Sequence, residues 1–363
     1  MCLCGITLTR RQLLTMALTA SAGTMLPGKR AQAAELSSAA KEVLQKTITV
    51  DAHSHARGMV FGPKMDDSLA AGMREGMLSA ICLAHVADGP VIGRNAAGVL
   101  GLVRTPEPGY LYKAHLERLD WMDRFSTGHG MRRVATLAEL KDAKAKGEPA
   151  FIQDIEGCDF LDGKLERLEE AQRRGVRVVQ LVHYIPNDIG DFQTGPVVHN
   201  GMTEFGAKAI RELNRLGVLV DVAHATEPLV RQAVKVSAKP LLLSHTALQG
   251  SKAQGTTPLA GRQITPDHAR MVADTGGVVG LWHFFPGIER YVQGIKEMVD
   301  VVGVDHVGVG TDQQTAPGTL QDYANYSNVA EQMLKSGFNA DETAKILGGN
   351  FVRIFGQATG APA

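Results

Sequence analysis

The chain has 363 residues, of which 44% are hydrophobic and 21% are charged. This length allows one large domain or two small ones with a well-buried core. Lysine and arginine together number 38, as do aspartate and glutamate. The balanced charge therefore gives no sign of nucleic-acid binding or of attraction to an anionic membrane.

The N-terminal residues have the features of an export signal. Arg10 and Arg11 form a twin arginine, a short apolar run follows, and residues 31–33 form a small-x-small cleavage site. This combination is typical of a Tat-type signal peptide, and the apolar run is too short for a stable membrane span. We therefore expect residues 1–33 to engage the Tat export machinery and residues 34–363 to be periplasmic. A charged N-terminal helix is the alternative.

Two of the four cysteines, Cys2 and Cys4, fall within the predicted signal. Cys82 and Cys158 lie in apolar runs, where a disulfide and two buried thiols both remain open. The signal has no lipobox cysteine and the C-terminus has no apolar tail, so we expect no membrane anchor.

Apolar runs rich in Val, Ile and Leu recur eight times along the chain, at 47–55, 78–86, 150–157, 176–184, 218–224, 240–246, 277–283 and 306–312. Sequence of helical character separates them, as at 165–174, 206–216, 227–236, 266–275 and 287–301. Apolar strands that alternate with amphipathic helices predict a buried parallel sheet. We therefore expect one (β/α)8 TIM-like barrel domain over 34–363.

An open, doubly wound sheet is the alternative architecture. It usually has a glycine-rich turn after its first strand, whereas this chain has Asp51-Ala52-His53-Ser54-His55 there. The connection over 87–149 is predicted to contain a helix at 106–126, and 323–354 to contain two more.

Chemically reactive side chains stand at the ends of the predicted strands. They are His53, His55, Glu156, His183, Tyr184, His224, His245, His283 and Asp312. The carboxyl ends of barrel strands meet on one face, and alternation places His53 and His55 on the same side of their strand. Imidazoles and a carboxylate suit Zn²⁺ and related divalent ions. We therefore predict a metal-dependent hydrolase whose ligands are His53, His55, Glu156, His224 and His245.

The other histidines carry weaker signals. His85 and His283 end the second and seventh predicted strands, and a structural role and a pocket-lining role are both open. We assign no role to the histidines on predicted helices, loops or a strand start, which are His115, His129, His199, His268 and His306.

Several motifs over residues 47–355 resemble the renal (membrane) dipeptidase family of zinc metallopeptidases. They are Val50-Asp51-Ala52-His53, Ile155-Glu156-Gly157, Leu181-Val182-His183, Asp221-Val222-Ala223-His224, Leu243-Ser244-His245-Thr246, the Gly261-Arg262 loop, Gly310-Thr311-Asp312 and Leu347-Gly348-Gly349-Asn350. The combination is more specific than any one of these motifs, since a lone His-x-His arises easily by chance.

The resemblance implies a dipeptidase with two Zn²⁺ ions. By this likeness His53 and residue 55 hold one ion, Glu156 bridges, and His224 and His245 hold the other. His183 would polarise the substrate carbonyl or stabilise the oxyanion, and Arg262 would bind the substrate carboxylate. Asp312 would bind the free amine and move the proton to the leaving nitrogen. Tyr184, beside His183, completes the expected substrate-binding set.

One position departs from the family, which usually has aspartate where this chain has His55. His-x-His also begins the wider amidohydrolase barrels, so a hydrolase of N-acyl amino acids, lactams or lactones is the main alternative function. A binding protein that kept the barrel and lost the chemistry is a third. The sequence leaves the oligomeric state open, a homodimer included.

Overall fold

The computed structural model describes residues 36–56, 68–94, 100–257, 259–313 and 318–360. These residues belong to one compact unit, Glu35–Ala363. The predicted signal at 1–33 lies outside the described residues and stays a prediction. None of the helices in the described part of the chain is long and apolar enough to cross a bilayer.

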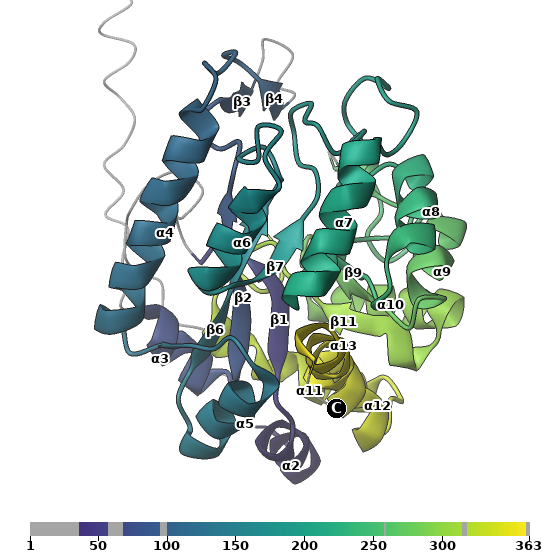
Figure 1. Ribbon diagram of the computed structural model, residues 1–363. Helices are drawn as coiled ribbons and strands as arrows, with labels where there is room; N and C mark the ends of the chain where they lie inside the picture. The colour runs from purple at the N-terminus through teal and green to yellow at the C-terminus, as the bar shows by residue number, and fades with distance from the viewer. Residues whose placement is uncertain (1–35, 57–67, 95–99, 258, 314–317, 361–363) are drawn as a thin grey trace, which may run out of the picture. The chain divides into compact units, whose positions relative to one another are not determined.

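Eight parallel strands form a nearly closed barrel (Figure 1). In sheet order they are β1 (Val50–Ser54), β2 (Ala80–Val86), β6 (Ala150–Glu156), β7 (Val176–Gln180), β8 (Leu219–Asp221), β9 (Leu242–Thr246), β10 (Val278–Leu281) and β11 (Val307–Val309). An isolated parallel bridge between Ser54 and Gln313 brings the last strand back to the first. The predicted TIM-like barrel is therefore confirmed, and the open doubly wound sheet is wrong.

Helices surround the strands and connect them. They are α3 (Ser68–Glu75), α4 (Tyr110–Gly128), α5 (Leu137–Lys146), α6 (Glu166–Arg173), α7 (Glu204–Leu216), α8 (Glu227–Val236), α9 (Pro266–Ala273) and α10 (Ile288–Val302). The bounds of α7 have a local cause, because the Thr203 side chain accepts a hydrogen bond from the Gly206 N–H and Gly217 ends the helix in the left-handed region. Its buried face, which includes Ile210 and Leu213, packs into the main core.

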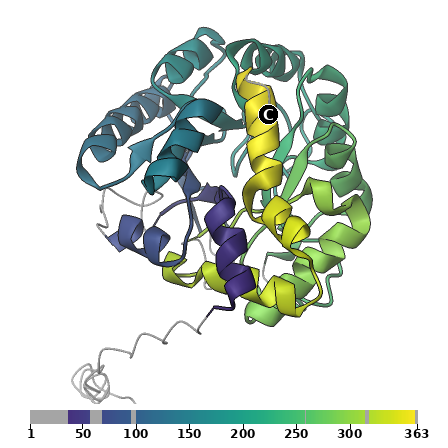
Figure 2. The same ribbon diagram turned by 90° about the horizontal axis from the view of Figure 1, so that it is seen from below.

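The C-terminal segment closes the bottom of the barrel (Figure 2). It contains α11 (Ser327–Lys335), α12 (Ala340–Ala344), a π-helical turn (Lys345–Gly349) and α13 (Asn350–Thr359), and α2 (Ser38–Lys46) packs against α11 and α12. Phe351 and Phe355 of α13 are buried in a cluster with strand residues such as Ile152 and Val178. The sequence predicted two helices here, and the structure has three α-helices together with the π-helical turn and a 3-10 turn at Tyr323–Asn325.

Most strands are shorter than the apolar runs that predicted them. β7 ends at Gln180, β8 at Asp221 and β11 at Val309, so that His183, His224 and Asp312 lie on loops three residues beyond their strands. Three short strands were not predicted. They are β3 (Ile92–Arg94) and β4 (Leu100–Leu102), which form a hairpin, and β5 (Arg132–Arg133), which pairs with β6.

Two glycines let β9 approach its neighbours closely. A Cβ at Gly280 or at Gly310 would lie 1.8 or 1.7 Å from the Ser244 carbonyl oxygen, so neither position tolerates a side chain. This close contact fixes the backbone of Ser244, the residue that precedes His245.

Cys82 and Cys158 are both buried free thiols, which excludes a disulfide between them.

Candidate metal centre

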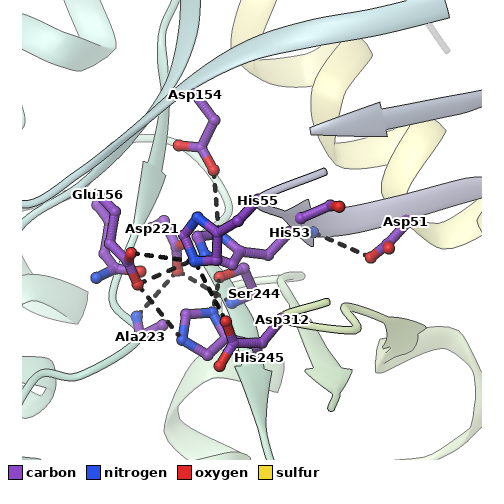
Figure 3. A network of polar contacts seen from close by, with 12 residues as sticks. Asp51, His53, His55, Asp154, Glu156, Asp221, Ala223, Ser244, His245 and Asp312 are labelled. Atoms are coloured by element: carbon purple, nitrogen blue, oxygen red, sulfur yellow. Dashed lines mark hydrogen bonds and ion pairs between the residues drawn. The ribbon is translucent and has the colours of Figure 1, made fainter. Parts of the chain in front are cut away.

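Glu156, the last residue of β6, is surrounded by imidazoles at the open end of the barrel. Its Oε1 lies 3.5 Å from His53 Nε2, 3.3 Å from His224 Nε2 and 3.7 Å from His245 Nε2. Its Oε2 lies 3.4 Å from His55 Nε2. Figure 3 shows His53, His55 and His245 gathered before this carboxylate. One carboxylate thus faces two groups of ring nitrogens.

The cluster divides into two overlapping triads that share Glu156. One is His53, His55 and Glu156, and the other is Glu156, His224 and His245; within each triad the ligand atoms lie within 4.8 Å of one another. All five side chains are at least 96% buried. His53 Nε2 and Glu156 Oε2 have no hydrogen-bond partner, although buried polar atoms almost always have one. The donor set therefore fits two divalent ions bridged by Glu156.

Burial acts to lower the pKa of His53, but Glu156 and Asp154 outweigh it and hold this pKa well above its usual value, whereas the pKa values of His224 and His245 are shifted in the opposite direction. Burial, together with the nearby positive charge of Arg262, holds the pKa values of His224 and His245 well below the usual range. Both rings are therefore neutral, which is the form that binds metal ions. Burial alone would raise the pKa of Glu156, but the surrounding histidines hold it well below its usual value. Glu156 is thus ionised.

Buried aspartates behind the cluster orient its ligands. His53 Nδ1 is 3.1 Å from Asp154 Oδ2, which fixes the ring and leaves Nε2 facing Glu156. Asp51 accepts hydrogen bonds from Thr311 N and from the Thr311 hydroxyl and so ties β1 to the loop after β11. Asp221 accepts from Ala223 N and from Ser244 N, the residues that precede His224 and His245.

Two site residues have unusual backbone conformations. His224 has φ +64° and Asp312 has φ +53°, both in the left-handed region. Each such residue costs of order 1–3 kcal/mol, and such residues cluster at functional sites. Their positions are held by hydrogen bonds from Gln193 N to His224 O at 2.7 Å and from Asp312 N to His53 O at 3.0 Å. The strained turns aim both side chains at the centre.

Arg262 lies at the edge of the second triad. It is only 3% exposed, and its Nη2 is 3.2 Å from His245 Nε2. Its Nη1 donates to Gln193 Oε1, and burial lowers the pKa of its guanidinium, although the neighbouring Tyr184 favours the charged form. At the first triad, Asp312 Oδ1 lies 3.2 Å from His55 Nε2. A buried cation and a carboxylate therefore flank the two triads.

His183 faces the same carboxylate as the predicted ligands. Its Nε2 lies 3.4 Å from Glu156 Oε1, and its Nδ1 lies 2.7 Å from Asp88 Oδ1. Burial lowers the pKa of His183, but Asp88 and Glu156 outweigh it and leave the pKa raised. His183 therefore adds a hydrogen-bonding imidazole beside the triads.

A comparison with known protein families identifies the chain. The family model described as "Membrane dipeptidase (Peptidase family M19)" matches residues 37–362. The chain belongs to the membrane dipeptidase family.

Individual relatives are more distant. The chain is 29% identical over 223 residues to "Dipeptidase tcpJ" of Claviceps purpurea (strain 20.1), an alignment that covers 57% of this chain and 51% of that protein. The chain thus spans about half the length of the curated relatives it matches.

Solved structures share the fold of this membrane dipeptidase family member. An amidohydrolase from Pseudomonas aeruginosa matches with TM-score 0.74 and 20% identity, over 88% of this chain and 99% of that one. A metallo peptidase from Rhodobacter sphaeroides, liganded with a phosphinate mimic of the dipeptide L-Ala-D-Ala, matches with TM-score 0.71 and 19% identity, over 86% and 99%.

The structure of this family member brings the predicted site residues together. All five predicted ligands converge, and His183, Tyr184, Arg262 and Asp312 lie around them. His85 does not line the centre, because it faces α4 and its Nε2 lies 3.0 Å from His115 Nδ1. His283 accepts a hydrogen bond from Leu320 N through its Nδ1 and belongs to neither triad.

Sequence reasoning gave no role to several side chains that orient the site, among them Asp154, Asp88 and Gln193. Asp154 stands two residues before Glu156 on the same strand, a spacing that places both on one face and that could have revealed it. Asp88 and Gln193 lie on loops 95 and 69 residues from their partners His183 and Arg262. No local sequence pattern predicts contacts between residues so far apart in the chain.

Proposed function

We propose that the protein is a zinc-dependent dipeptidase. The observation that carries the proposal is that Arg262 lies 3.2 Å from His245, a predicted ligand of the second triad, and Asp312 lies 3.2 Å from His55, a predicted ligand of the first. A guanidinium binds a carboxylate, and a carboxylate binds an ammonium group. A substrate that bridges the two is a short zwitterion whose peptide bond lies over Glu156, which describes a dipeptide.

The residues divide the chemistry as follows. Bound divalent ions supply Lewis-acid polarisation and a water of lowered pKa. Arg262 holds the substrate carboxylate, with Tyr184 packed beside it. His183 Nε2 contacts the carbonyl oxygen and stabilises the negative charge that develops there. Asp312 holds the amine and carries the proton to the leaving nitrogen.

Zinc and the periplasm belong to the same proposal. Four imidazoles with one shared carboxylate are ligands that zinc accepts well, although imidazole also suits other transition metals. The twin arginine at Arg10-Arg11 and the cleavage site at 31–33 support export by the Tat machinery. Transport of an already folded protein agrees with a buried metal centre.

Hydrolysis of N-acyl amino acids is the second candidate function. It is favoured by Arg262, which would bind the carboxylate of such substrates equally well. Asp312 discriminates between the two functions, because an acylated nitrogen carries no positive charge for it to bind. Lactams and lactones without a carboxylate would leave the buried Arg262 unused.

Assays of the zinc-loaded protein with matched substrates test the proposal. We expect turnover of a dipeptide, with kcat/KM at least about 100-fold lower for its N-acetyl derivative and for its C-terminal amide, since each loses a charged hydrogen bond. Arg262→Gln should raise KM for the dipeptide and leave the dipeptide amide unaffected.

Turnover confined to N-acyl amino acids would overturn the dipeptidase proposal in favour of the second candidate. Absence of hydrolysis of every compound by a protein that contains two ions per chain would favour a binding protein.

A further inference from the structure

Asp88 is a fully buried carboxylate just beyond β2, and both of its oxygens are used at the site. Oδ1 lies 2.7 Å from His183 Nδ1, and Oδ2 accepts a hydrogen bond from Tyr184 N at 3.0 Å. A carboxylate of this kind only accepts, so Nδ1 of His183 carries a proton. One side chain thus clamps two consecutive residues of the substrate-facing loop.

The loop itself gives His183 little support. β7 ends at Gln180, and His183 lies in irregular backbone beyond the strand ladder. The ring contacts the Tyr184 and His224 rings edge-on, with centroids 4.4 and 4.5 Å apart, and neither contact distinguishes one ring nitrogen from the other. With Nδ1 bound to Asp88, Nε2 is the nitrogen that faces Glu156 Oε1, at 3.4 Å. The Asp88 contact therefore selects the ring orientation.

We propose that Asp88 is a positioning residue that holds the His183 imidazole with its Nε2 toward the metal centre, and that the hydrogen bond it accepts from Tyr184 N steadies the loop that carries this ring. The inference rests on the proposed function of His183 at the substrate carbonyl. Asp88 contacts neither the substrate nor the predicted ligands, so its contribution passes through His183. Carboxylates that orient metal-binding histidines change metal affinity or activity by about 10–100-fold when they are removed, and we expect an effect of the same order for one that orients His183.

A double-mutant cycle on the zinc-loaded protein tests this inference. Asp88→Asn should lower kcat for a dipeptide about 10–100-fold, change KM less than about threefold, and leave two ions per chain. Because Asp88 acts through His183, the double variant Asp88→Asn/His183→Gln should be no slower than His183→Gln alone. If the rate losses of the two single variants multiplied in the double variant, Asp88 would have a general structural role and the inference would be overturned. The same holds if Asp88→Asn lost metal and had a lower Tm.

Asp159 offers a matched control. It is 8% exposed, and burial and the neighbouring Asp88 raise its pKa well above the usual range. Asp159→Asn is a near-isosteric change of a buried carboxyl group in the same region, and it leaves the contact between Asp88 and His183 in place. We expect its kcat to stay within about threefold of the wild type.

A measurement on the wild-type protein, with Asp88 in place, keeps the test independent of folding defects in the variants. Long-range ¹H–¹⁵N correlation of histidine-labelled wild-type protein, assigned through His183→Gln, should show a protonated Nδ1 on His183. An unprotonated Nδ1 would overturn the inference. This readout needs no substrate, so failure of the dipeptidase proposal in the substrate panel remains distinguishable from failure of the Asp88 contact.

Discussion

At the scale of single residues, His55 is the side chain that sets this centre apart. It follows directly after β1, and its Nε2 lies between Glu156 Oε2 at 3.4 Å and Asp312 Oδ1 at 3.2 Å. An imidazole stands here where the resemblance to the dipeptidase family leads us to expect an aspartate. The first triad would therefore hold an ion with one carboxylate ligand, Glu156, and with a second carboxylate, that of Asp312, close by.

Replacement of His55 tests whether it is a ligand. We expect His55→Asp to keep or raise the metal content, because a carboxylate restores an anionic donor to a cationic site. His55→Ala should lose about one of the two ions, since the first triad is left with two ligands. Inductively coupled plasma mass spectrometry after dialysis gives the ion count per chain. A His55→Ala protein with unchanged metal content and activity would show that His55 is no ligand.

At the scale of elements, a buried histidine pair joins β2 to α4. His85 Nε2 and His115 Nδ1 are 3.0 Å apart, and the His115 ring stacks on Phe160 with centroids 4.1 Å apart. Burial and the positive charge of Arg118 lower the pKa of His85 to about 3, and burial holds the pKa of His115 well below its usual value. Both rings are therefore neutral in the folded protein.

This pair should make the protein less stable in mild acid. The unfolded chain binds protons on these histidines below about pH 6.5 and the folded chain does not, so stability is lost as pH falls. Between pH 7 and pH 5 His85 contributes a loss of about 2 kcal/mol, and His115 adds to it in the same direction. The double variant His85→Leu/His115→Phe should lose correspondingly less stability between pH 7 and pH 5, because it lacks both histidines.

Urea unfolding of metal-free wild-type and variant protein at both pH values measures this difference. Exposed His199 provides the control, because His199→Gln removes a histidine from the surface and should leave the wild-type pH dependence intact. An equal loss of stability in the wild type and the double variant would contradict a neutral buried pair.

At the scale of the whole molecule, the metal centre links strands that are distant in the sequence. Its predicted ligands come from β1 and the residue after it, from β6 and β9, and from the loop after β8. The barrel closes where the Asp312 N–H, in the loop after β11, donates a hydrogen bond to His53 O of β1. Ions that bind the folded chain alone stabilise it by mass action, by about 2.7 kcal/mol for each site at 100 times Kd.

Removal of metal should therefore lower the melting temperature. We expect a chelated sample to melt earlier than a zinc-loaded one, with recovery on addition of Zn²⁺, in differential scanning calorimetry. Glu156→Gln, which removes the shared carboxylate, should show a smaller shift on addition of Zn²⁺. Identical melting of chelated and loaded wild-type protein, with two ions present in the latter, would refute the stabilising role.

The sequence by itself determined the barrel and the core of the metal centre. Apolar runs that alternate with helical sequence are a local signal, and the convergence of strand ends in a parallel barrel carries residues such as His53, Glu156 and His245 to one place. Even Asp312, beyond β11, was found because it stands near a strand end. The signal at residues 1–33 is likewise a local pattern, and it stays a prediction.

The tertiary structure alone decided which neighbouring groups act on these residues. His85 and His283 had equal standing in the sequence, yet His85 packs against α4 and neither joins a triad. Asp88 contacts His183 across 95 residues, and Gln193 contacts Arg262 across 69. The physical reason is that periodicity reports which side of an element is buried, whereas the partner of a loop side chain depends on how separate elements pack.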